Sequence, residues 1–273
     1  MNKYRRYVSG FFLHTTLIIL LFLLLYPLAM ALWGSFKSAS DFDRTQWYPT
    51  LPLYLSNLWY AFGKLFRPIL NTLLVAVIGT AGVLFISSLS AYAYARMKFP
   101  GRNFLYMFVI ALMMVPGCLT LVPSYMLYKG TIGIDNYAIM ILPMWVGAPI
   151  SGVFLLRGFF AGLPEGIFEA ARIDGAGEFY VYTRICLPLS LPILGTMTIM
   201  QFSNVWNDYM WPMITIKDEN LLTVSASLLL KYSASTQPAT YAGYLVASLL
   251  LVFLFLFANK YYVEGLASTA LKL

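Results

Sequence analysis

The stretch FFLHTTLIILLFLLLYPLAMALW, residues 11–33, decides the fold class of this chain. It contains no Lys, Arg, Asp or Glu, and it exceeds the roughly 20 apolar residues that a helix needs to cross the hydrocarbon core of a bilayer. Lys3, Arg5 and Arg6 precede it, and Ala29–Ala31 resembles the cleavage site of a secretory signal. Because the apolar run is longer than a normal signal core, we expect an uncleaved first transmembrane helix.

The composition of the whole chain also indicates a membrane protein. Hydrophobic residues make up 60% of it, charged residues make up only 11%, and the mean hydropathy is +0.74. A soluble domain usually carries about a quarter charged residues. Most side chains of this protein must therefore face something other than water.

Five further segments are long and apolar enough to span a bilayer. The six expected helices cover approximately residues 11–33, 69–94, 104–122, 137–156, 186–211 and 241–259. The sequence thus predicts an all-α membrane protein with about six transmembrane helices. We expect them to form a single transmembrane domain over residues 1–273.

The lysines and arginines between the spans predict the orientation, because cytoplasmic loops carry an excess of both. With the N-terminus inside, eleven basic residues face the cytoplasm and seven face the other side, so both termini are expected in the cytoplasm. The cytoplasmic residues are Lys3, Arg5, Arg6, Arg96, Lys98, Arg102, Arg157, Arg172, Arg184, Lys260 and Lys272, and the outer residues are Lys37, Arg44, Lys64, Arg67, Lys129, Lys217 and Lys231.

Prolines and small residues indicate bent, closely packed helices. Prolines in or at the ends of the expected spans can kink them, since each removes a backbone donor. Ser87, Ala91 and Ala95 recur at every fourth position of the second span, so another helix can approach closely there. The prolines are Pro27, Pro116, Pro123, Pro143, Pro149, Pro188 and Pro192.

Several classes of function lack the residues that they need. His14 is the one histidine, so a zinc hydrolase site or a histidine-based triad has no second partner. The net charge of +7 is not gathered in one stripe, as nucleic-acid binding would favour. Cys118 and Cys186 lie in or beside apolar runs and do not indicate a disulfide framework. No Walker-type stretch predicts ATP binding by this chain.

The connection between the fourth and fifth spans, approximately residues 163–188, is long and moderately charged. Pro164 suits a first helical turn, and Glu165 and Glu169 lie on one face near the positive end of the helix. Gly175 can take the left-handed turn that ends a helix. We therefore expect a short helix, a glycine turn and a second short helix on the cytoplasmic side. The same pattern is typical of a simple interfacial connector.

The motif EAARIDGAG in this connection resembles the EAA signature of ABC importer permeases. Glycine follows the second alanine by four residues, and Ile-x-Leu-Pro comes after nine more. SLSAYAYARMKFPGRN, MMVPGCLTLVPSYML, GVFLLRGFF and NVWNDYMWPMI look like the carbohydrate-uptake branch of this family, more narrowly its maltose-permease G-type subunits. The residues that match the signature are Glu169, Ala170, Ala171, Gly175, Ile185, Leu187 and Pro188.

This resemblance implies a type I ABC importer permease fold, with a cytoplasmic coupling helix between transmembrane helices 4 and 5. In the family, that helix docks in a groove of the ATPase subunit and transmits closure of the ATPase dimer to the pore. Carried over, Glu169 would make a polar contact to the ATPase, and Ala170 and Ala171 would allow close packing. Gly175 would set the turn, and Asp174 belongs to the same ATPase-coupling set.

The resemblance also implies the partners. The chain would form half of the translocation pathway for a sugar or oligosaccharide that an extracytoplasmic binding protein delivers. A homologous second permease, expected to be a different chain, and two nucleotide-binding ATPase subunits would complete the assembly. This chain would be no enzyme and would bind no cofactor, since ATP and magnesium would sit on the ATPase subunits. Its location would be a bacterial or archaeal plasma membrane.

Polar residues of the fifth expected span are candidates for the substrate path. Amides and a carboxylate there could bond sugar hydroxyls, and an aromatic ring could stack on a sugar face. Alternatively, the aromatic residues belong to the outer aromatic belt and the polar ones cap the helix or bond a neighbour. The candidates are Asn204, Trp206, Asn207, Asp208 and Tyr209.

Two other classes of protein compete with the importer. A self-sufficient secondary transporter or channel would show inverted repeats and intramembrane ion-coupling residues. A membrane-embedded enzyme would show catalytic residues clustered near one bilayer face. Neither pattern is present in the sequence, and the EAA motif would have no purpose in a secondary transporter.

Overall fold

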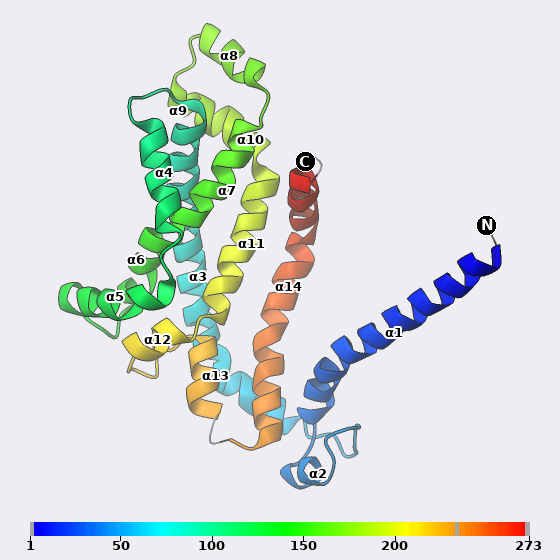
Figure 1. Cartoon of the computed structure of the whole chain (residues 1–273). Coiled ribbons are helices and arrows are strands. Elements are labelled where there is room, and N and C mark those ends of the chain that lie inside the picture. Colours follow the sequence, from blue (N-terminus) through cyan, green and yellow to red (C-terminus); the bar gives the residue numbers. More distant parts are fainter. Residues whose placement is uncertain (1–2, 233–234, 271–273) are drawn as a thin grey trace. The chain divides into compact units, whose positions relative to one another are not determined.

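The computed structural model describes residues 3–232 and 235–270 (Figure 1). For residues 3–9, 254 and 257–270 it describes the backbone alone. Every regular element in these ranges is a helix, which confirms the all-α prediction for the described part of the chain. Lys272, which was counted in the charge bias, lies outside the described residues.

The chain divides into two units. The first comprises Met1–Phe66 and Leu228–Leu250, and the second comprises Arg67–Ser227 and Leu251–Leu273. The first unit contains α1 (Lys3–Gly34), α2 (Ala39–Arg44) and parts of α3 (Ser56–Arg96), α13 (Val224–Tyr232) and α14 (Gln237–Ala270).

Within the first unit, a buried lysine organises the segment around α2. The Lys37 ammonium donates hydrogen bonds to the carbonyl oxygens of Thr45, at 2.7 Å, and Tyr48, at 2.6 Å. The side chain of Asn57 donates to the carbonyl of Lys37 at 2.8 Å. These bonds satisfy carbonyl groups of a segment that has little regular structure of its own.

The second unit is a helical bundle that carries the candidate site. In it, α7 contacts α4, α6 and α11. One end of the bundle carries α8, and the other end carries α5 and α12 (Figure 1). Besides the rest of α3, α13 and α14, its helices are α4 (Arg102–Leu112), α5 (Gly117–Thr131), α6 (Tyr137–Gly147), α7 (Pro149–Ala161), α8 (Glu165–Ile173), α9 (Glu178–Val181), the π-helical turn η1 (Tyr182–Cys186), α10 (Leu187–Leu189), α11 (Leu191–Asn207) and α12 (Met210–Thr215).

Three of the expected spans are bent helix pairs in the structure. The pair α4 and α5 is bent by 95°, α6 and α7 by 42°, and the helix ending at Leu189 and α11 by 77°. A proline lies at or beside each break: Pro116, Pro149 and Pro188. Pro116 is extended, with φ −61° and ψ 130°, and it directly precedes α5, where the missing N–H of a proline leaves no helix hydrogen bond unmade. The kinks expected from these prolines are confirmed.

The described residues supply two to five candidate membrane spans. Gly10–Gly34 and Ser56–Arg96 are each long and apolar enough to cross a bilayer. If each bent pair is one span, the described residues supply up to five. The apolar described part of α14, Gln237–Phe253, is shorter. Six spans therefore stay a prediction.

The small-residue face of α3 packs against α7. Ser87 and Ala91 are fully buried, and Ala95 lies against the same core. The Ser87 hydroxyl donates to the carbonyl of Pro149 in α7 at 3.5 Å. A β-carbon on Gly152 would overlap the Ser87 side chain. The prediction that another helix approaches α3 closely at this face is confirmed.

This contact predicts opposite effects of alanine at two glycines of α7. Glycine to alanine in a helix usually stabilises by about 0.5–1 kcal/mol. At Gly158 a β-carbon meets nothing within 4 Å, whereas at Gly152 it would overlap Ser87 and Met197. We expect Gly152→Ala to destabilise by about 1–3 kcal/mol, because the core is already full there. Thermal unfolding of the detergent-solubilised protein measures both variants, and a Gly152→Ala protein as stable as Gly158→Ala would contradict this packing.

Candidate functional site

The helix α8 ends where its sequence predicts, but it begins one residue later, because Pro164 was expected in its first turn. Pro164 precedes it in an extended conformation, with φ −59° and ψ 123°. Gly175 follows it with φ +81°, in the left-handed region that favours glycine, so this prediction is confirmed. The N–H of Ala176 donates to the carbonyl of Ala171 at 2.9 Å, and the N–H of Gly175 donates to that of Arg172 at 3.1 Å. This pair of bonds is the Schellman motif, which satisfies the last carbonyls of the helix.

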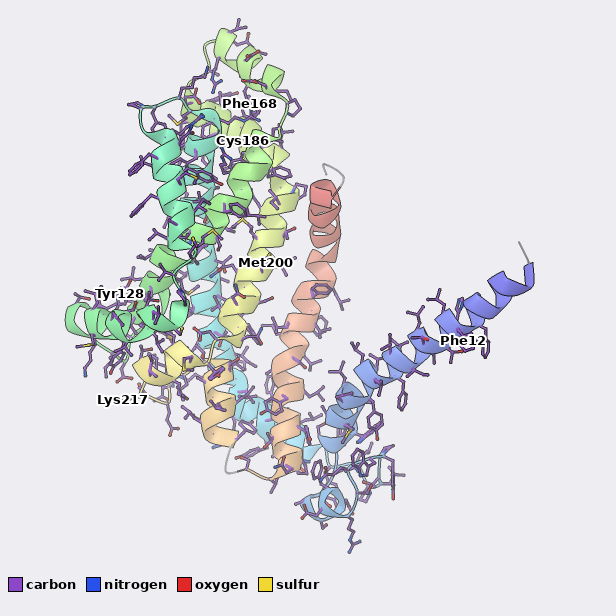
Figure 2. The ribbon with its side chains drawn as sticks, viewed as in Figure 1. Phe12, Tyr128, Phe168, Cys186, Met200 and Lys217 are labelled. Carbon is purple, nitrogen blue, oxygen red and sulfur yellow. The ribbon has the colours of Figure 1, made fainter. Side chains whose placement is uncertain are left out.

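One side chain of α8 anchors the helix in the bundle. Phe168 is fully buried in a core cluster drawn from six elements. Figure 2 shows Phe168 and Cys186 close together beneath α8. Burying a phenylalanine contributes about 1.5–3 kcal/mol. The buried members of the cluster are Ala91 and Tyr92 of α3, Leu156 and Phe160 of α7, Phe168 of α8, Val181, Tyr182 and Cys186 of α9 and η1, and Ile193 and Met197 of α11.

Another side of α8 is exposed. Glu165, Glu169 and Ile173 follow one another at intervals of four and therefore share one side of the helix. Ile173 is 85% exposed, which is unusual for a large apolar residue next to a core. Of the residues expected to couple to an ATPase, Glu169, Ala170, Asp174 and Gly175 are exposed, while Ala171 is half-buried against the cluster.

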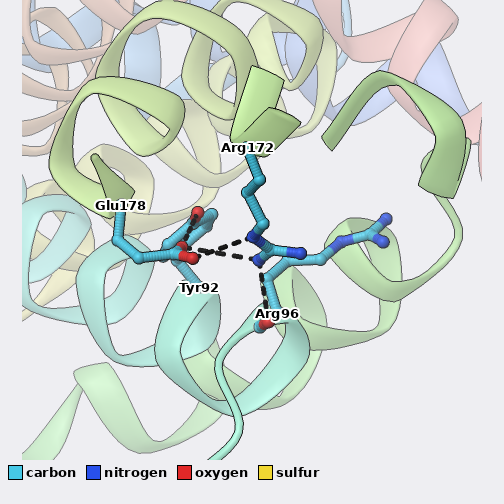
Figure 3. A network of polar contacts seen from close by, with 4 residues as sticks. All are labelled: Tyr92, Arg96, Arg172 and Glu178. Carbon is cyan, nitrogen blue, oxygen red and sulfur yellow. Dashed lines mark hydrogen bonds and ion pairs between the residues drawn. The ribbon is translucent and has the colours of Figure 1, made fainter. Parts of the chain in front are cut away.

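An ion pair joins the end of α8 to the start of α9 (Figure 3). Arg172 Nε lies 2.9 Å from Glu178 Oε1. Arg172 Nη2 also donates to the carbonyl of Arg96, the last residue of α3, at 3.2 Å. The Tyr92 hydroxyl of α3 donates to Glu178 Oε2 at 2.6 Å. The hydrogen bond to Glu178 raises the pKa of Arg172 above its ordinary value.

Arg96 connects α3 to the segment that leads into α8. Its Nη2 donates to the carbonyls of Phe160, at 2.5 Å, and Leu163, at 2.6 Å. Its guanidinium also lies over the ring of Phe168, 4.1 Å from the ring centroid. The last carbonyls of α7 have no partner within that helix. A cation at this position pairs with them, and the negative end of the helix dipole stabilises its charge.

Sequence reasoning did not identify these contacts. A signal was available, because Ser88, Tyr92 and Arg96 place a polar group at every fourth residue at the end of an otherwise apolar helix. All three bond to the segment that follows α7, since Ser88 also shares a hydrogen bond of 2.7 Å with the Tyr182 hydroxyl.

The burial of Phe168 predicts a stability difference between two phenylalanines of this segment. Phe168→Ala should destabilise the protein by about 3–5 kcal/mol, because it empties a filled core and uncovers Arg96. Phe179, which is 71% exposed, is the matched control, and Phe179→Ala should change stability by less than about 0.5 kcal/mol. Thermal unfolding in detergent gives the comparison. Similar losses in both variants would show that Phe168 does not anchor α8.

A second polar network lies at the opposite end of this bundle, near Lys217 (Figure 2). The Asp135 carboxylate accepts the backbone N–H groups of Lys217 and Asp218, the latter at 2.8 Å. The N–H of Asp135 donates to the carbonyl of Thr215 at 3.1 Å. The two backbone donors hold the pKa of the Asp135 carboxyl below its ordinary value.

Asn71 of α3 forms further hydrogen bonds at the end of the bundle that carries Asp135. Its side-chain amide donates to the carbonyls of Asn220, at 2.8 Å, and Leu222, at 3.0 Å. Its oxygen accepts the Tyr137 hydroxyl at 2.9 Å. The segment after α12 is therefore attached to α3 as well as to the loop before α6.

The lowered pKa of Asp135 predicts a pH-dependent stabilisation. It should be fully present above the ordinary aspartate pKa of 3.8 and be lost as the pH falls through the lower value of the folded state. Asp135→Asn retains the tolerance for its positive φ of 60° but has no carboxyl to titrate. Melting temperatures across this acid range should converge for the two proteins at low pH. A constant difference would contradict the assignment, and Asp43→Asn, at an exposed site, is the control.

The candidates for the substrate path do not gather at one cavity. Asn204 and Asp208 line a cavity of about 250 Å³ with Gln201 and Trp211. Trp206 is buried and stacks on Phe202, with ring centroids 5.9 Å apart. The remaining two, Asn207 and Tyr209, are exposed, and the Asn207 amide donates to the carbonyl of Ser203 at 2.8 Å.

Asp208 has a structural role as well as a place at the cavity. Its Oδ1 accepts the N–H of Trp211 in the first turn of α12, at 3.2 Å. The Trp211 indole donates to the carbonyl of Ile139 at 2.7 Å and also lines a second cavity of about 590 Å³, between the breaks of α4–α5 and α6–α7. Ser124 and Tyr128 of α5 lie on that second cavity. Sequence reasoning did not identify Trp211 as a cavity residue.

Comparison with known proteins places this chain in a family. Residues 82–267 match the family described as "binding-protein-dependent transport system inner membrane component". The arabinooligosaccharides transport system permease protein AraQ of Bacillus subtilis strain 168 is 33% identical, over 99% of this chain and 97% of its own length. The sn-glycerol-3-phosphate transport system permease protein UgpE of Yersinia enterocolitica is 30% identical, over 94% of this chain and 96% of its own length.

The fold has been seen in solved structures. A chain of a bacterial ABC transporter involved in the import of the acidic polysaccharide alginate superposes with a TM-score of 0.84 at 20% identity, covering 96% of this chain and 99% of that one. A chain of a bacterial alginate ABC transporter in complex with alginate pentasaccharide-bound periplasmic protein gives a TM-score of 0.66 at 17% identity, covering 94% of both chains. This chain therefore has the type I ABC importer permease fold. On the family match and the identity to its curated relatives, it belongs to the family of binding-protein-dependent transport system inner membrane components.

Proposed function

We propose that this chain is the transmembrane subunit of an ATP-driven ABC importer and forms half of the pathway for a sugar or oligosaccharide. The observation that carries the proposal is α8, a short helix anchored by Phe168 on one face and exposed, with Glu169 and Ile173, on another. An exposed face on an anchored helix suits docking against another protein. Family membership supports the importer over a self-sufficient secondary transporter or channel.

The exposed face of α8 docks on a nucleotide-binding ATPase subunit in this proposal. Glu169 makes a polar contact to it, Ala170 and Ala171 allow close packing, and Asp174 and Gly175 shape the turn that follows. ATP favours one arrangement of the ATPase pair, and α8 conveys that arrangement to the bundle. Reversing a 1:99 population of two states takes about 5.5 kcal/mol of differential binding, which nucleotide and binding protein supply together.

The partner chains supply the chemistry. Two ATPase subunits hold ATP and magnesium, so this chain is not itself an enzyme and binds no cofactor. A homologous but different permease provides the other half of the pathway. An extracytoplasmic binding protein delivers the sugar. The names of the relatives mention arabinooligosaccharides, sn-glycerol-3-phosphate and alginate. These names support a sugar or a related polyol phosphate as the class of substrate.

The substrate path in this chain includes the cavity lined by Asn204 and Asp208. An amide and a carboxylate beside the Trp211 ring offer the donors, acceptors and apolar face that a sugar needs. The assignment of Trp206, Asn207 and Tyr209 to the path stays a prediction, because none of them lines this cavity.

The topology follows the distribution of basic residues. Six spans, with α14 as the last, place both termini in the cytoplasm of a bacterial or archaeal cell whose plasma membrane holds the protein. The end of the bundle that carries α8 then faces the cytoplasm, and the end that carries Asp135 and Lys217 faces outward. These are the sides from which an ATPase and a binding protein would approach.

The docking role predicts a selective loss of transport. Glu169→Lys and Ile173→Asp change the exposed face of α8 without touching the core, so the protein should fold. Each should lower sugar uptake at least about tenfold, equivalent to about 1.4 kcal/mol at an interface residue. Proteoliposomes with the full assembly and the binding protein, tested with arabinooligosaccharides, sn-glycerol-3-phosphate and alginate oligosaccharides, provide the measurement.

A charge reversal away from α8 is the control. Asp43 is exposed in α2, and Asp43→Lys should retain uptake and ATPase activity. Co-purification of the ATPase subunits with each variant separates lost docking from lost transport. Normal co-purification together with normal uptake in both α8 variants would make the helix a simple connector and end the coupling proposal.

A further inference from the structure

We propose that the Arg172–Glu178 ion pair and the Ser88–Tyr92–Arg96 face of α3 form a joint that carries a movement of α8 into α3. The inference rests on the coupling role proposed for α8 and assigns it the residues that transmit the movement. Arg172, Glu178, Tyr92 and Arg96 are positioning residues in this scheme, because none of them needs to touch the sugar or the nucleotide.

The backbone alone connects α8 to the bundle poorly. Gly162 precedes the helix, and Gly175 and Gly177 follow it. Glycine populates more backbone conformations than any other residue, so such a linker absorbs a displacement instead of passing it on. Side-chain contacts must therefore carry a movement of α8 if it is to reach the membrane helices.

The side-chain contacts of α8 converge on the end of α3. Arg172 reaches the last carbonyl of α3, that of Arg96, at 3.2 Å. The Arg96 guanidinium covers the Phe168 ring at 4.1 Å and holds the carbonyls that follow α7. Glu178, the partner of Arg172, is held in turn by the Tyr92 hydroxyl at 2.6 Å.

The same face of α3 continues the connection along the helix. Ser88, Tyr92 and Arg96 lie one turn apart, and they bond η1, α9 and the α7–α8 segment respectively. A displacement of α8 therefore acts on α3 directly at Arg96. Through Glu178 and Tyr182 it also acts on α3 at Tyr92 and Ser88. Because the side chains of Arg172 and Glu178 are 36% and 40% exposed, water screens their attraction and the pair adds little to stability. The pair matters because it fixes the position of α8 relative to α9 and α3.

The test is a double-mutant cycle with transport efficiency as the readout. Arg172→Ala and Glu178→Ala should each lower the sugar transported per ATP hydrolysed at least about fivefold, the lower end of typical coupling between sites. The double variant should lose no more than either single one, since the two residues act as a unit. Arg172→Lys retains the charge and should recover part of the efficiency. The substrates are the three used to test α8.

Two controls separate this role from a merely structural one. Arg184→Ala removes an exposed arginine of η1 and should leave the transport efficiency unchanged. A structural role would lower the melting temperature and the yield of the assembly while the sugar transported per ATP stays constant. An unchanged ratio in Arg172→Ala and Glu178→Ala would therefore overturn the proposal, even if both variants were less stable.

A distance measurement tests the joint without any sugar. Spin labels at Gly166 of α8, where a side chain meets nothing within 4 Å, and at Phe85 of α3, which is 61% exposed, report the rigidity of the connection. Replacing the exposed Cys118 by serine avoids labelling it. We expect one narrow distance in the full assembly with the otherwise unaltered chain, with and without ATP, and a broad distribution in the assembly with Arg172→Ala.

The outcomes distinguish this inference from the proposed function. Narrow distances in Arg172→Ala overturn the joint whatever the sugar assays show. A loss of transport in Glu169→Lys, together with normal efficiency in Arg172→Ala and Glu178→Ala, keeps the coupling helix and rejects its transmission through this joint. Normal transport in Glu169→Lys rejects the proposed coupling role itself.

Discussion

The bundle depends on one constraint, the burial of Phe168 beneath the guanidinium of Arg96. A helix as short as α8 has no stability of its own, because a helix of nine residues cannot recover the cost of its nucleation in water. Phe168 supplies the apolar area that orders α8, and Arg96 covers its ring while it pairs the carbonyls after α7. The position of one phenylalanine thus decides which face of α8 is free.

The two ends of this bundle are held by different kinds of contact. At the α8 end an aromatic side chain enters a core built from six elements, and an ion pair reinforces it from outside. At the other end the backbone N–H groups of Lys217 and Asp218 converge on one carboxylate, and Asn71 pairs the carbonyls of the segment after α12. Loops without regular structure need such polar partners, because their backbone groups have no neighbours of their own.

The sequence was sufficient where one physical rule dominates. Length and hydropathy locate the apolar helices, and the left-handed turn at Gly175 follows because only glycine takes it without strain. The small side chains at Ser87 and Ala91 predict the contact with a neighbouring helix, although not that the neighbour is α7. Prolines predict that a helix breaks, but the 95° between α4 and α5 depends on packing that no local rule contains.

The site was less predictable, because its contacts join distant parts of the chain. Tyr92 and Glu178 are far apart in the sequence, and the pairing of Arg172 with Glu178 requires the chain to reverse at Gly175. The spacing of Ser88, Tyr92 and Arg96 indicates a polar face, yet their partners become visible only in the folded bundle. The same holds for Trp211, which lines two cavities that different helices build.

The close contact between Ser87 and Gly152 has a mechanical consequence for α3. A helix in van der Waals contact with its neighbour at a glycine cannot shift sideways there, so a force on its end makes it tilt about that point. Arg96 lies nine positions after Ser87, a distance of about 14 Å along the helix at the rise of about 1.5 Å per residue. The contact acts as a pivot, so the stretch of α3 before Ser87 must move in the direction opposite to the end at Arg96.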